Sequence, residues 1–509
     1  MKKLFAMMLA LVMVLAAVPV LAEGEETYVA KIGEQEYTTL DEAIEAANDG
    51  DTIVLLADCE TEGMNLEKNL SIDGGTDNHT VRFTQYGIAL WGKSLMFKNC
   101  KVVMDGIHST PYTAEWNWMT ICASKDASLL LENTEMTMNG AEGNTAHAIY
   151  FCSNNKLNLT DSKLEIKNYQ QDALEWDGGD GGYNVNITNS TFISDHNRSG
   201  FTGTFTAKID NSKVDVINST GNGSNGSHFE IVNGSAVNFS DNNDHGLSTG
   251  RLTIDNSTVT ANGNGGNGVH AGGTLIIKNN AAVEIKKNNC SISSKWTIPG
   301  ALYVAGAEGS NIDKTSAVTI TENKGSGILL KGGSLNIEEG AKLTVMNNTA
   351  ELLEYGGGVN VRGNLTLPQN AKIYNNHAAK AGDDIYNAED ASITFGNVGS
   401  AWILDDCNHM INGWYDDAEN SRWNSTCDGK PCIAERPDHA SMVVAGRISG
   451  PKALKAAHDA QITTEEPWYP PYNPTPVQPV QPVQPAPLPP QTGDMPLWYA
   501  VAQFLGLVK

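Results

Sequence analysis

A group of four carboxylates and one tryptophan near the middle of the chain could bind a sugar or a cation. These residues surround a glycine-rich stretch and are Asp172, Glu175, Trp176, Asp177 and Asp180. Carboxylate oxygens are the ligands that Ca²⁺ prefers, and two carboxylates can act as acid and base on a glycosidic bond, with tryptophan stacking on a sugar ring. We favour the simpler interpretation, a solvated glycine-rich loop.

A second group consists of the aromatic residues Tyr112, Trp116 and Trp118. Rings at this spacing could form a loop that stacks on sugar rings. The alternative, which we prefer, is that they cover an exposed edge of the hydrophobic core.

Three histidines form a third candidate group. His228 and His270 each lie two residues after a glycine, Ser248 lies between them in the sequence, and Asp244-His245-Gly246 is nearby. With the repeat described below, His228 and His270 should lie on one face, about 9 to 10 Å apart. Histidine can act as acid or base, but no contacting partner can be identified from the sequence. Stacked polar surface residues are therefore the preferred interpretation, and we expect no catalytic residue.

The elements that position these residues are predicted by a repeat. An apolar strand, a short turn and a second apolar strand recur at intervals of 22 to 35 residues. The first apolar residue after each turn is Met136, Leu164, Phe192, Val214, Val237, Val259, Val283, Val318, Leu343 and Ile373. Alternating apolar residues exclude helices, and a unit of about 22 residues indicates a solenoid. We predict an all-β, right-handed parallel β-helix with these residues in one internal file. A leucine-rich-repeat solenoid is the alternative, but its leucine spacing is missing.

The turns and insertions of this repeat can also be located. Asn189, Asn211, Asn233, Asn256 and Asn279 should occupy left-handed bends and bond to one another. Longer intervals predict loops near 105–117, 139–147, 169–183, 288–315 and 347–358, which could form the walls of a binding groove.

The eight cysteines are scattered, so most should be buried small apolar residues. Cys427 could pair with Cys432 or Cys407, and zinc binding by these three with His409 or His439 is a minor alternative because no Cys-x-x-Cys occurs. We therefore expect no metal and no cofactor, with Ca²⁺ left open.

The ends of the chain differ in character from the repeat. Residues 1–22 have the basic, apolar and small-residue regions of a signal peptide. Residues 39–49 form a capping helix in this prediction, with the capping box Thr39 to Glu42. The β-helix should span 23–395 and a small module 396–466. Residues 467–490 are a proline-rich spacer, stiff because proline favours the polyproline II conformation.

The segment from Tyr37 to Leu56, the repeats, and the phrase from Gly382 to Asn387 resemble the pectate-lyase-like right-handed parallel β-helix superfamily. Adhesin-like surface proteins of Gram-positive gut bacteria are the most similar group. The resemblance implies that any enzyme of this kind would be a polysaccharide hydrolase or lyase. Of the hydrolase motifs only His245-Gly246 is present, and of the few arginines in the repeats Arg198 alone lies near Asp195 and His196.

Residues 489–509 resemble a sortase sorting signal, with cleavage expected between Thr492 and Gly493, although the apolar tail is short and ends in one lysine. The partners implied are sortase and peptidoglycan. The formal charge of −25, from 59 acidic and 34 basic residues, excludes nucleic acid as a partner.

Together these features predict a secreted, wall-attached adhesin or binding module for glycans or host proteins. The alternative is an extracellular polysaccharide lyase or glycoside hydrolase that acts on an acidic polysaccharide. A passive surface coat without a specific ligand is a third interpretation.

Overall fold

The computed structural model describes most of the chain between residues 27 and 458. The described residues are 27–111, 118–141, 143, 145–152, 154–178, 183–290, 299–306, 308–351, 355–368, 371–395, 402–403, 410–419 and 447–458. Several predictions lie outside them: the signal peptide, the spacer, the sorting signal, Tyr112, Trp116, Asp180, Cys407, Cys427, Cys432, His409 and His439. The chain forms two compact units, one ending at Thr260 and one beginning at Ala261.

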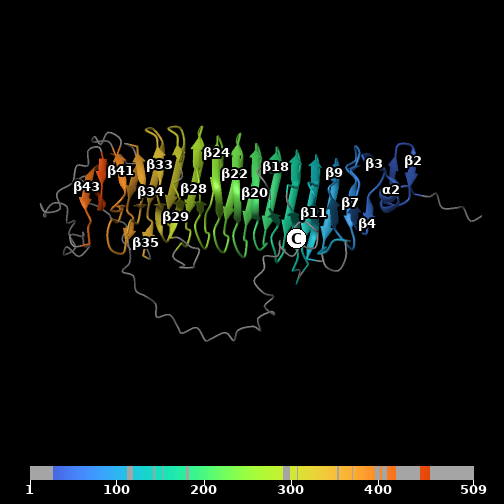
Figure 1. The fold of residues 1–509 in the computed structure, drawn as a ribbon, viewed down its shortest axis with the longest axis horizontal. Coiled ribbons are helices and arrows are strands. Elements are labelled where there is room, and N and C mark those ends of the chain that lie inside the picture. The colour runs from blue at the N-terminus through green and yellow to red at the C-terminus, as the bar shows by residue number, and fades with distance from the viewer. Residues whose placement is uncertain are drawn as a thin grey trace, which may run out of the picture. The chain divides into compact units, whose positions relative to one another are not determined.

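Most coils of unit 1 contain three short strands, as β14 (His147–Cys152), β15 (Lys156–Thr160) and β16 (Lys163–Lys167) illustrate. Alternate residues of β15 and β16 are buried, so each strand places one set of side chains inside the coil. Equivalent strands of successive coils pair in parallel, and the three positions therefore build three parallel sheets (Figure 1).

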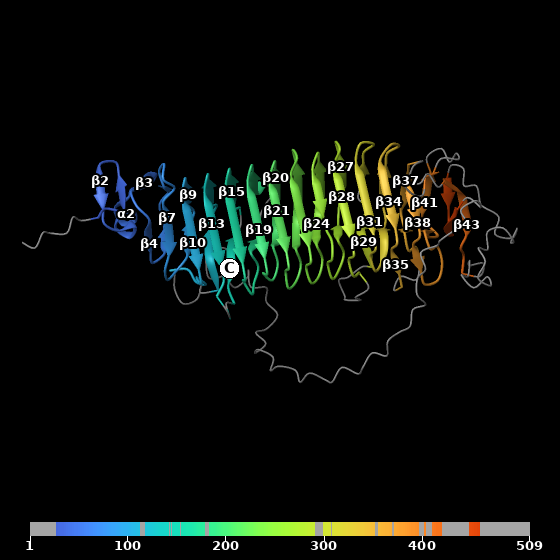
Figure 2. The same cartoon turned by 180° about the vertical axis from the view of Figure 1, so that it is seen from behind.

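Sheet 1 of unit 1 contains β5 (Met64–Leu66), β8 (Ile88–Trp91), β11 (Met119–Ser124), β14, β17 (Leu174–Asp177) and the first parts of β20 (Phe201–Asp210), β22 (Ser224–Val232) and β24 (Leu247–Asp255). Sheet 2 contains β3 (Asp51–Leu55), β6 (Leu70–Asp73), β9 (Ser94–Lys98), β12 (Ser128–Glu132), β15, β18 (Tyr183–Thr188) and the later parts of the same three long strands. Sheet 3 contains β4 (Cys59–Thr61), β7 (Thr80–Phe83), β10 (Lys101–Asp105), β13 (Glu135–Asn139), β16, β19 (Thr191–Asp195), β21 (Lys213–Ile217), β23 (Ala236–Ser240) and β25 (Thr258–Thr260), and several of these strands are labelled in Figure 2.

Unit 2 repeats the same arrangement. Its sheet 1 contains β26 (Val269–Ala271), β29 (Gly300–Val304), β32 (Ser326–Leu330), β36 (Val359–Val361) and β40 (Ile385–Asn387). Its sheet 2 contains β27 (Leu275–Lys278), β30 (Asn311–Ile312), β33 (Ser334–Ile337), β37 (Asn364–Leu367) and β41 (Ser392–Phe395). Its sheet 3 contains β28 (Ala282–Lys286), β31 (Ala317–Thr321), β34 (Lys342–Met346) and β38 (Lys372–Tyr374), with a small added pair of β35 (Thr349–Ala350) and β39 (His377–Ala378).

The predicted internal file is confirmed in unit 1. Met136, Leu164, Phe192, Val214, Val237 and Val259 stand opposite one another in register and are buried. In unit 2, Val283, Val318 and Leu343 are aligned in the same way. The placement of Ile373 is wrong, because it stands opposite Val345 and not Leu343. A shift of two residues keeps the alternation, so Ile373 still faces inward and is fully buried. The fold is therefore an all-β parallel β-solenoid, as predicted.

The predicted asparagine bends are also confirmed. Asn189, Asn211, Asn233, Asn256 and Asn279 have φ between 45° and 57°, a conformation that asparagine tolerates better than most residues. In unit 1 the Asn211 side-chain amide donates to Oδ1 of Asn189 at 2.9 Å, as predicted, but the Asn233 amide donates to Oδ1 of Asp210 at 2.7 Å and not to Asn211.

Beside these bends of unit 1 runs a buried ladder of serines. The amides of Ser162, Ser190, Ser212 and Ser235 donate to the hydroxyl of the serine one coil later, ending at Ser257, at 3.0 to 3.2 Å. Unit 2 has a ladder of the same kind at a different turn, the one that follows the strands of sheet 3, and it consists of Asn264, Asn288, Asn323, Asn348 and Asn376.

The described ends of the two units are closed differently. In unit 1, α2 (Leu40–Ala46) has Thr39 as its N-cap and forms the predicted capping box with Glu42, while Leu40 and Ala43 are buried. This helix is shorter than the predicted 39–49. Beside it, β1 (Ala30–Ile32) pairs with β2 (Gln35–Tyr37) and with β3.

In unit 2 the last coil is covered by antiparallel strands: β42 (Trp402–Ile403), β43 (Met410–Asp416), β44 (Arg447–Ser449) and β45 (Lys452–His458). The buried Asp383, part of the phrase from Gly382 to Asn387, contacts Nζ of Lys455 at 3.3 Å. No helix among the described residues is long and apolar enough to cross a membrane.

Cys59, Cys100, Cys122 and Cys290 are buried, as predicted, and Cys152 is partly exposed. Burial raises the pKa of the Cys59 and Cys290 thiols to about 12. These thiols therefore behave as small apolar groups at neutral pH.

Candidate functional site

Sheet 1 of unit 1 carries a group of polar and aromatic side chains that come from four successive coils. We call it the His147 cluster, and it comprises Trp118, His147, Tyr150, Asp172, Glu175, Asp177 and Arg198. Strand pairing aligns Tyr150 with Glu175, and Cys152 with Asp177. Asp172 and Arg198 lie in the turns that precede β17 and β20. The stacking of coils therefore brings together residues that are far apart in the sequence.

An ion pair lies at the base of the cluster. Nε and Nη2 of Arg198 donate to the two carboxylate oxygens of Asp172 at 2.9 and 2.5 Å. The Asp172 side chain is fully buried, whereas the Arg198 side chain is 46% exposed. The hydrogen bonds to Asp172 raise the pKa of Arg198, so the guanidinium is charged and held in one orientation.

A histidine and a glutamate meet above this pair. Nδ1 of His147 lies 2.6 Å from Oε2 of Glu175 and 3.8 Å from Oδ2 of Asp172. Nδ1 of His147 and Oε2 of Glu175 are both buried, and neither has a hydrogen-bonding partner with good geometry among the described residues. The two atoms are therefore in close contact but lack the alignment of a hydrogen bond.

Two aromatic rings flank the histidine. Trp118 meets His147 edge to face at 5.6 Å and Tyr150 at 4.9 Å between ring centroids. The Tyr150 hydroxyl donates to Asp177, and burial, together with neighbouring carboxylates, raises the pKa of Tyr150 far above its ordinary value. Tyr150 is therefore a neutral hydrogen-bond donor at any physiological pH.

The cluster also contains a potential set of metal ligands. One donor atom each from His147, Asp172 and Glu175 lie within 4.8 Å of one another. However, Arg198 already occupies both oxygens of Asp172, so a cation would have to displace a guanidinium from a buried carboxylate. We therefore assign no metal here.

Three of the four carboxylates of the predicted group lie close together in the structure. Asp172, Glu175 and Asp177 all belong to the cluster, and the preferred interpretation of this stretch as a solvated loop is wrong for them. Residues 174 to 177 form strand β17, so the insertion predicted at 169–183 is interrupted by a core element.

Trp176 does not offer a surface to a sugar. It is 1% exposed and packs between Phe151 and Phe205, with ring centroids at 4.4 and 5.7 Å. The alternation along β17 explains this difference, because Leu174 and Trp176 face inward while Glu175 and Asp177 face outward.

The predicted histidine face is wrong within unit 1. His228 stands opposite Thr206 and Arg251, whereas Ser248 stands opposite Asn225. Gly226, two residues before His228, and Gly246, two residues before Ser248, do not occupy equivalent positions in their coils. The reason is that β22 and β24 each run through both sheet 1 and sheet 2. His245 is 8% exposed, and burial lowers its pKa. In unit 2, His270 is stacked on Tyr303 at 4.3 Å.

Sequence reasoning missed His147 and Tyr150 as site residues. His147 precedes Asp172 by 25 residues, close to one repeat. Aligning the repeats on the small residues Ala148 and Ala173, which follow them directly, would have placed the two side chains next to each other.

Comparisons with known proteins add little to this description. No family model and no curated protein matches the chain. Among solved structures, the chain is similar to the crystal structure of the periplasmic alginate epimerase AlgG, at 9% identity, with 65% of this chain and 81% of that chain covered and a TM-score of 0.21. A likeness this low carries no argument about the site. The chain is a parallel β-solenoid with a polar and aromatic cluster on sheet 1 of unit 1.

Proposed function

We propose that this protein is an exported surface protein whose solenoid binds a glycan at the His147 cluster. The observation that carries the proposal is the combination of the partly exposed Trp118, whose ring is held edge to face by the buried Tyr150, with the fixed guanidinium of Arg198 within the same four successive coils. Aromatic rings bind the apolar faces of sugars, and a guanidinium N–H group can donate a hydrogen bond to a sugar hydroxyl group.

Arg198 is available for such a ligand. Its Nε and Nη2 atoms are used by Asp172, and Nη1 has no partner among the described residues. The side chain is nearly half exposed. The contact with Asp172 therefore orients the guanidinium of Arg198 and leaves Nη1 able to donate to a ligand.

The charge of the cluster indicates the class of glycan. The carboxylates of Asp172, Glu175 and Asp177 outnumber the guanidinium of Arg198, and the whole chain carries a formal charge of −25. An anionic polymer would be repelled by this field. We therefore propose a neutral glycan or one that contains amino sugars.

The location of the protein is proposed from the sequence alone. Residues 1–22 direct export, 467–490 hold the solenoid away from the surface, and cleavage between Thr492 and Gly493 attaches it to the wall of a Gram-positive cell. Mass spectrometry of wall fragments released by muramidase tests this. A chain that still carries residues 493–509 would exclude sortase attachment.

A glycan array probed with the full chain tests the binding function. Trp118→Ala and His147→Ala should each lower binding of the neutral or amino-sugar ligands by about tenfold or more, which corresponds to about 1.4 kcal/mol. Tyr183→Ala removes an aromatic residue that is 40% exposed but lies outside the cluster, and it should leave binding unchanged. Equal loss in all three variants, or no bound glycan, would contradict the proposal.

One observation favours an enzyme as a second candidate. The 2.6 Å distance between Nδ1 of His147 and Oε2 of Glu175 is that of a general base and the carboxylate that orients it, although the two groups are not aligned as a hydrogen bond. Incubation with a panel of polysaccharides, read by ultraviolet absorbance of unsaturated products and by new reducing ends, distinguishes the candidates. Turnover that His147→Ala abolishes would replace the binding function by catalysis.

A further inference from the structure

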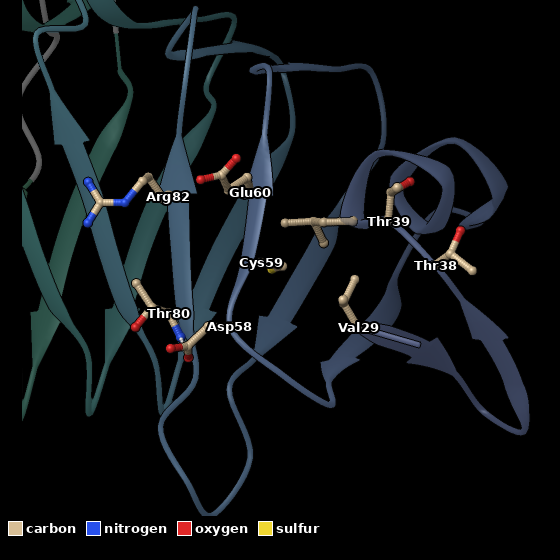
Figure 3. Close-up of a pocket in the computed structure, with 9 residues that line it drawn as sticks. Val29, Thr38, Thr39, Asp58, Cys59, Glu60, Thr80 and Arg82 are labelled. Atoms are coloured by element: carbon tan, nitrogen blue, oxygen red, sulfur yellow. Dashed lines mark hydrogen bonds between the residues drawn. The ribbon is translucent and has the colours of Figure 1, made fainter. Parts of the chain in front are cut away.

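A groove of ≈ 570 Å³ lies at the described start of unit 1, between β4 and the elements β1 and α2 (Figure 3). Leu40 and Cys59 provide its apolar lining, Val29 lies on the opposite wall, and Asp58, Glu60 and Arg82 form its polar rim. Leu40 is completely buried and Cys59 is 8% exposed. The groove therefore has an apolar floor and a charged margin.

One wall of the groove is the edge of a sheet. Among the described residues, β4 pairs in parallel with β7 on one side and is the last strand of sheet 3. Sheet 2 is treated differently, because β1 pairs with its strand β3 and β2 pairs with β1. Added strands therefore cover the first strand of sheet 2, whereas β4, the first strand of sheet 3, keeps a free edge among the described residues.

The helix protects only one end of this edge. The carboxylate of Asp41 accepts hydrogen bonds from the Thr61 hydroxyl at 2.5 Å and from the Glu62 amide at 3.3 Å. The segment from Asp58 to Glu60 lines the groove and receives no such cover from Asp41. An unpaired strand edge readily accepts another extended chain.

We propose that this groove binds a short, basic, extended segment of a partner protein, which adds to β4 as a further strand of sheet 3. Asp58 and Glu60 supply the complementary charge, while the guanidinium of Arg82 is shared with Asp105 at 3.5 Å. His79 lies 3.5 Å from Asp58 and is the other nearby group that can carry positive charge. A second copy of this chain is disfavoured, because each copy carries a formal charge of −25.

The charge of Asp58 persists into mildly acidic solution. The Thr80 amide donates to its carboxylate at 2.8 Å, and this hydrogen bond lowers the pKa of Asp58. Binding should therefore weaken with added salt but remain intact when the pH is lowered moderately below neutral.

The test uses the full chain and the peptide Ac-Lys-Val-Lys-Val-Lys-NH2, with binding measured by calorimetry. Two N-methylated forms of the peptide block alternate sets of amides. Because only one set can face β4 in a strand, one form should lose binding about tenfold or more, and the other should stay within about threefold of the parent.

Protein variants provide the matched control. Glu60→Lys should weaken peptide binding about tenfold or more, and the exposed position of Glu60 leaves the fold intact, as circular dichroism will verify. Glu165→Lys is the control, because Glu165 occupies the equivalent position on β16, an interior strand paired on both sides. Equal binding of both methylated peptides, no binding of the parent peptide, or dimers of the chain in solution would overturn the proposal.

Discussion

At the scale of single residues, the contact between Asp172 and Arg198 is asymmetric. The carboxylate is fully buried, and the guanidinium is nearly half exposed. Removing the cation leaves a buried carboxylate without its two hydrogen bonds and with only His147 nearby at 3.8 Å, whereas removing the anion leaves a cation that can reach water. The two halves of one ion pair should therefore differ in their effect on stability.

This asymmetry yields the first prediction. Arg198→Ala should lower the free energy of unfolding by about 2 to 4 kcal/mol, less than for a completely buried pair because water screens Arg198. Asp172→Asn should cost clearly less, and the double variant should recover most of the loss. Urea unfolding of the three variants measures the difference. Equal costs for the two single variants would contradict the assigned burial.

The same scale shows what the sequence could and could not predict. The inward positions of Met136 and Val214 follow from alternation within strands that have clear ends. Trp176 was misplaced because Asp177 and the glycines after it resemble a loop, which hid the boundaries of β17. His147 was missed because its partners Asp172 and Glu175 become neighbours only when one coil stacks on the next.

At the scale of elements, α2 depends on its capping box. Thr39 accepts a hydrogen bond from the Glu42 amide at 3.2 Å, and the Glu42 carboxylate accepts from Thr38 at 2.8 Å and from the Thr39 amide at 3.3 Å. Thr39→Ala should destabilise the helix by about 1 kcal/mol. Hydrogen exchange of the α2 amides, compared with those of β16, reports this local loss.

The cap should also depend on pH. The hydrogen bond from Thr38 is the largest of the interactions that lower the pKa of Glu42 below its ordinary value of 4.5. The stabilisation is therefore complete above about pH 4.5 and is lost as the pH falls through the lower pKa of the folded state. Glu42→Gln should remove this dependence of hydrogen exchange on pH, and Glu45→Gln, outside the capping box, should retain it.

The asparagine bends between strands depend on a left-handed backbone conformation. Asn211 has a φ of 45°, where a β-carbon is costly unless the side chain compensates. Asn211→Ala should cost about 1 to 2 kcal/mol in unfolding free energy, whereas Asn211→Gly should cost less because glycine adopts this φ without strain. Urea unfolding of both variants gives the comparison, and a larger cost for glycine would contradict the argument.

At the scale of the whole molecule, each coil contacts chiefly the coils before and after it, as in other solenoids. Residues 211–232 span one coil of unit 1, since Asn211 and Asn233 occupy equivalent bends. Deleting these 22 residues should leave a shorter solenoid that still unfolds cooperatively in thermal scans followed by circular dichroism. Deleting only 211–221 should abolish folding, because it places strands of different sheets against each other.

In the serine ladder of unit 1, each serine amide donates to a serine that comes later in the sequence. This order affects how the coils form while the chain is being synthesised. The amide of Ser190 finds its acceptor on Ser212, and the amide of Ser212 finds its acceptor on Ser235. In an exported chain that is still being synthesised, a coil that has crossed the membrane thus has a buried donor without an acceptor until the following coil arrives. At roughly 5 to 20 residues per second, that wait lasts on the order of seconds. Translation speed therefore sets how long each unfinished coil is exposed to chaperones and proteases.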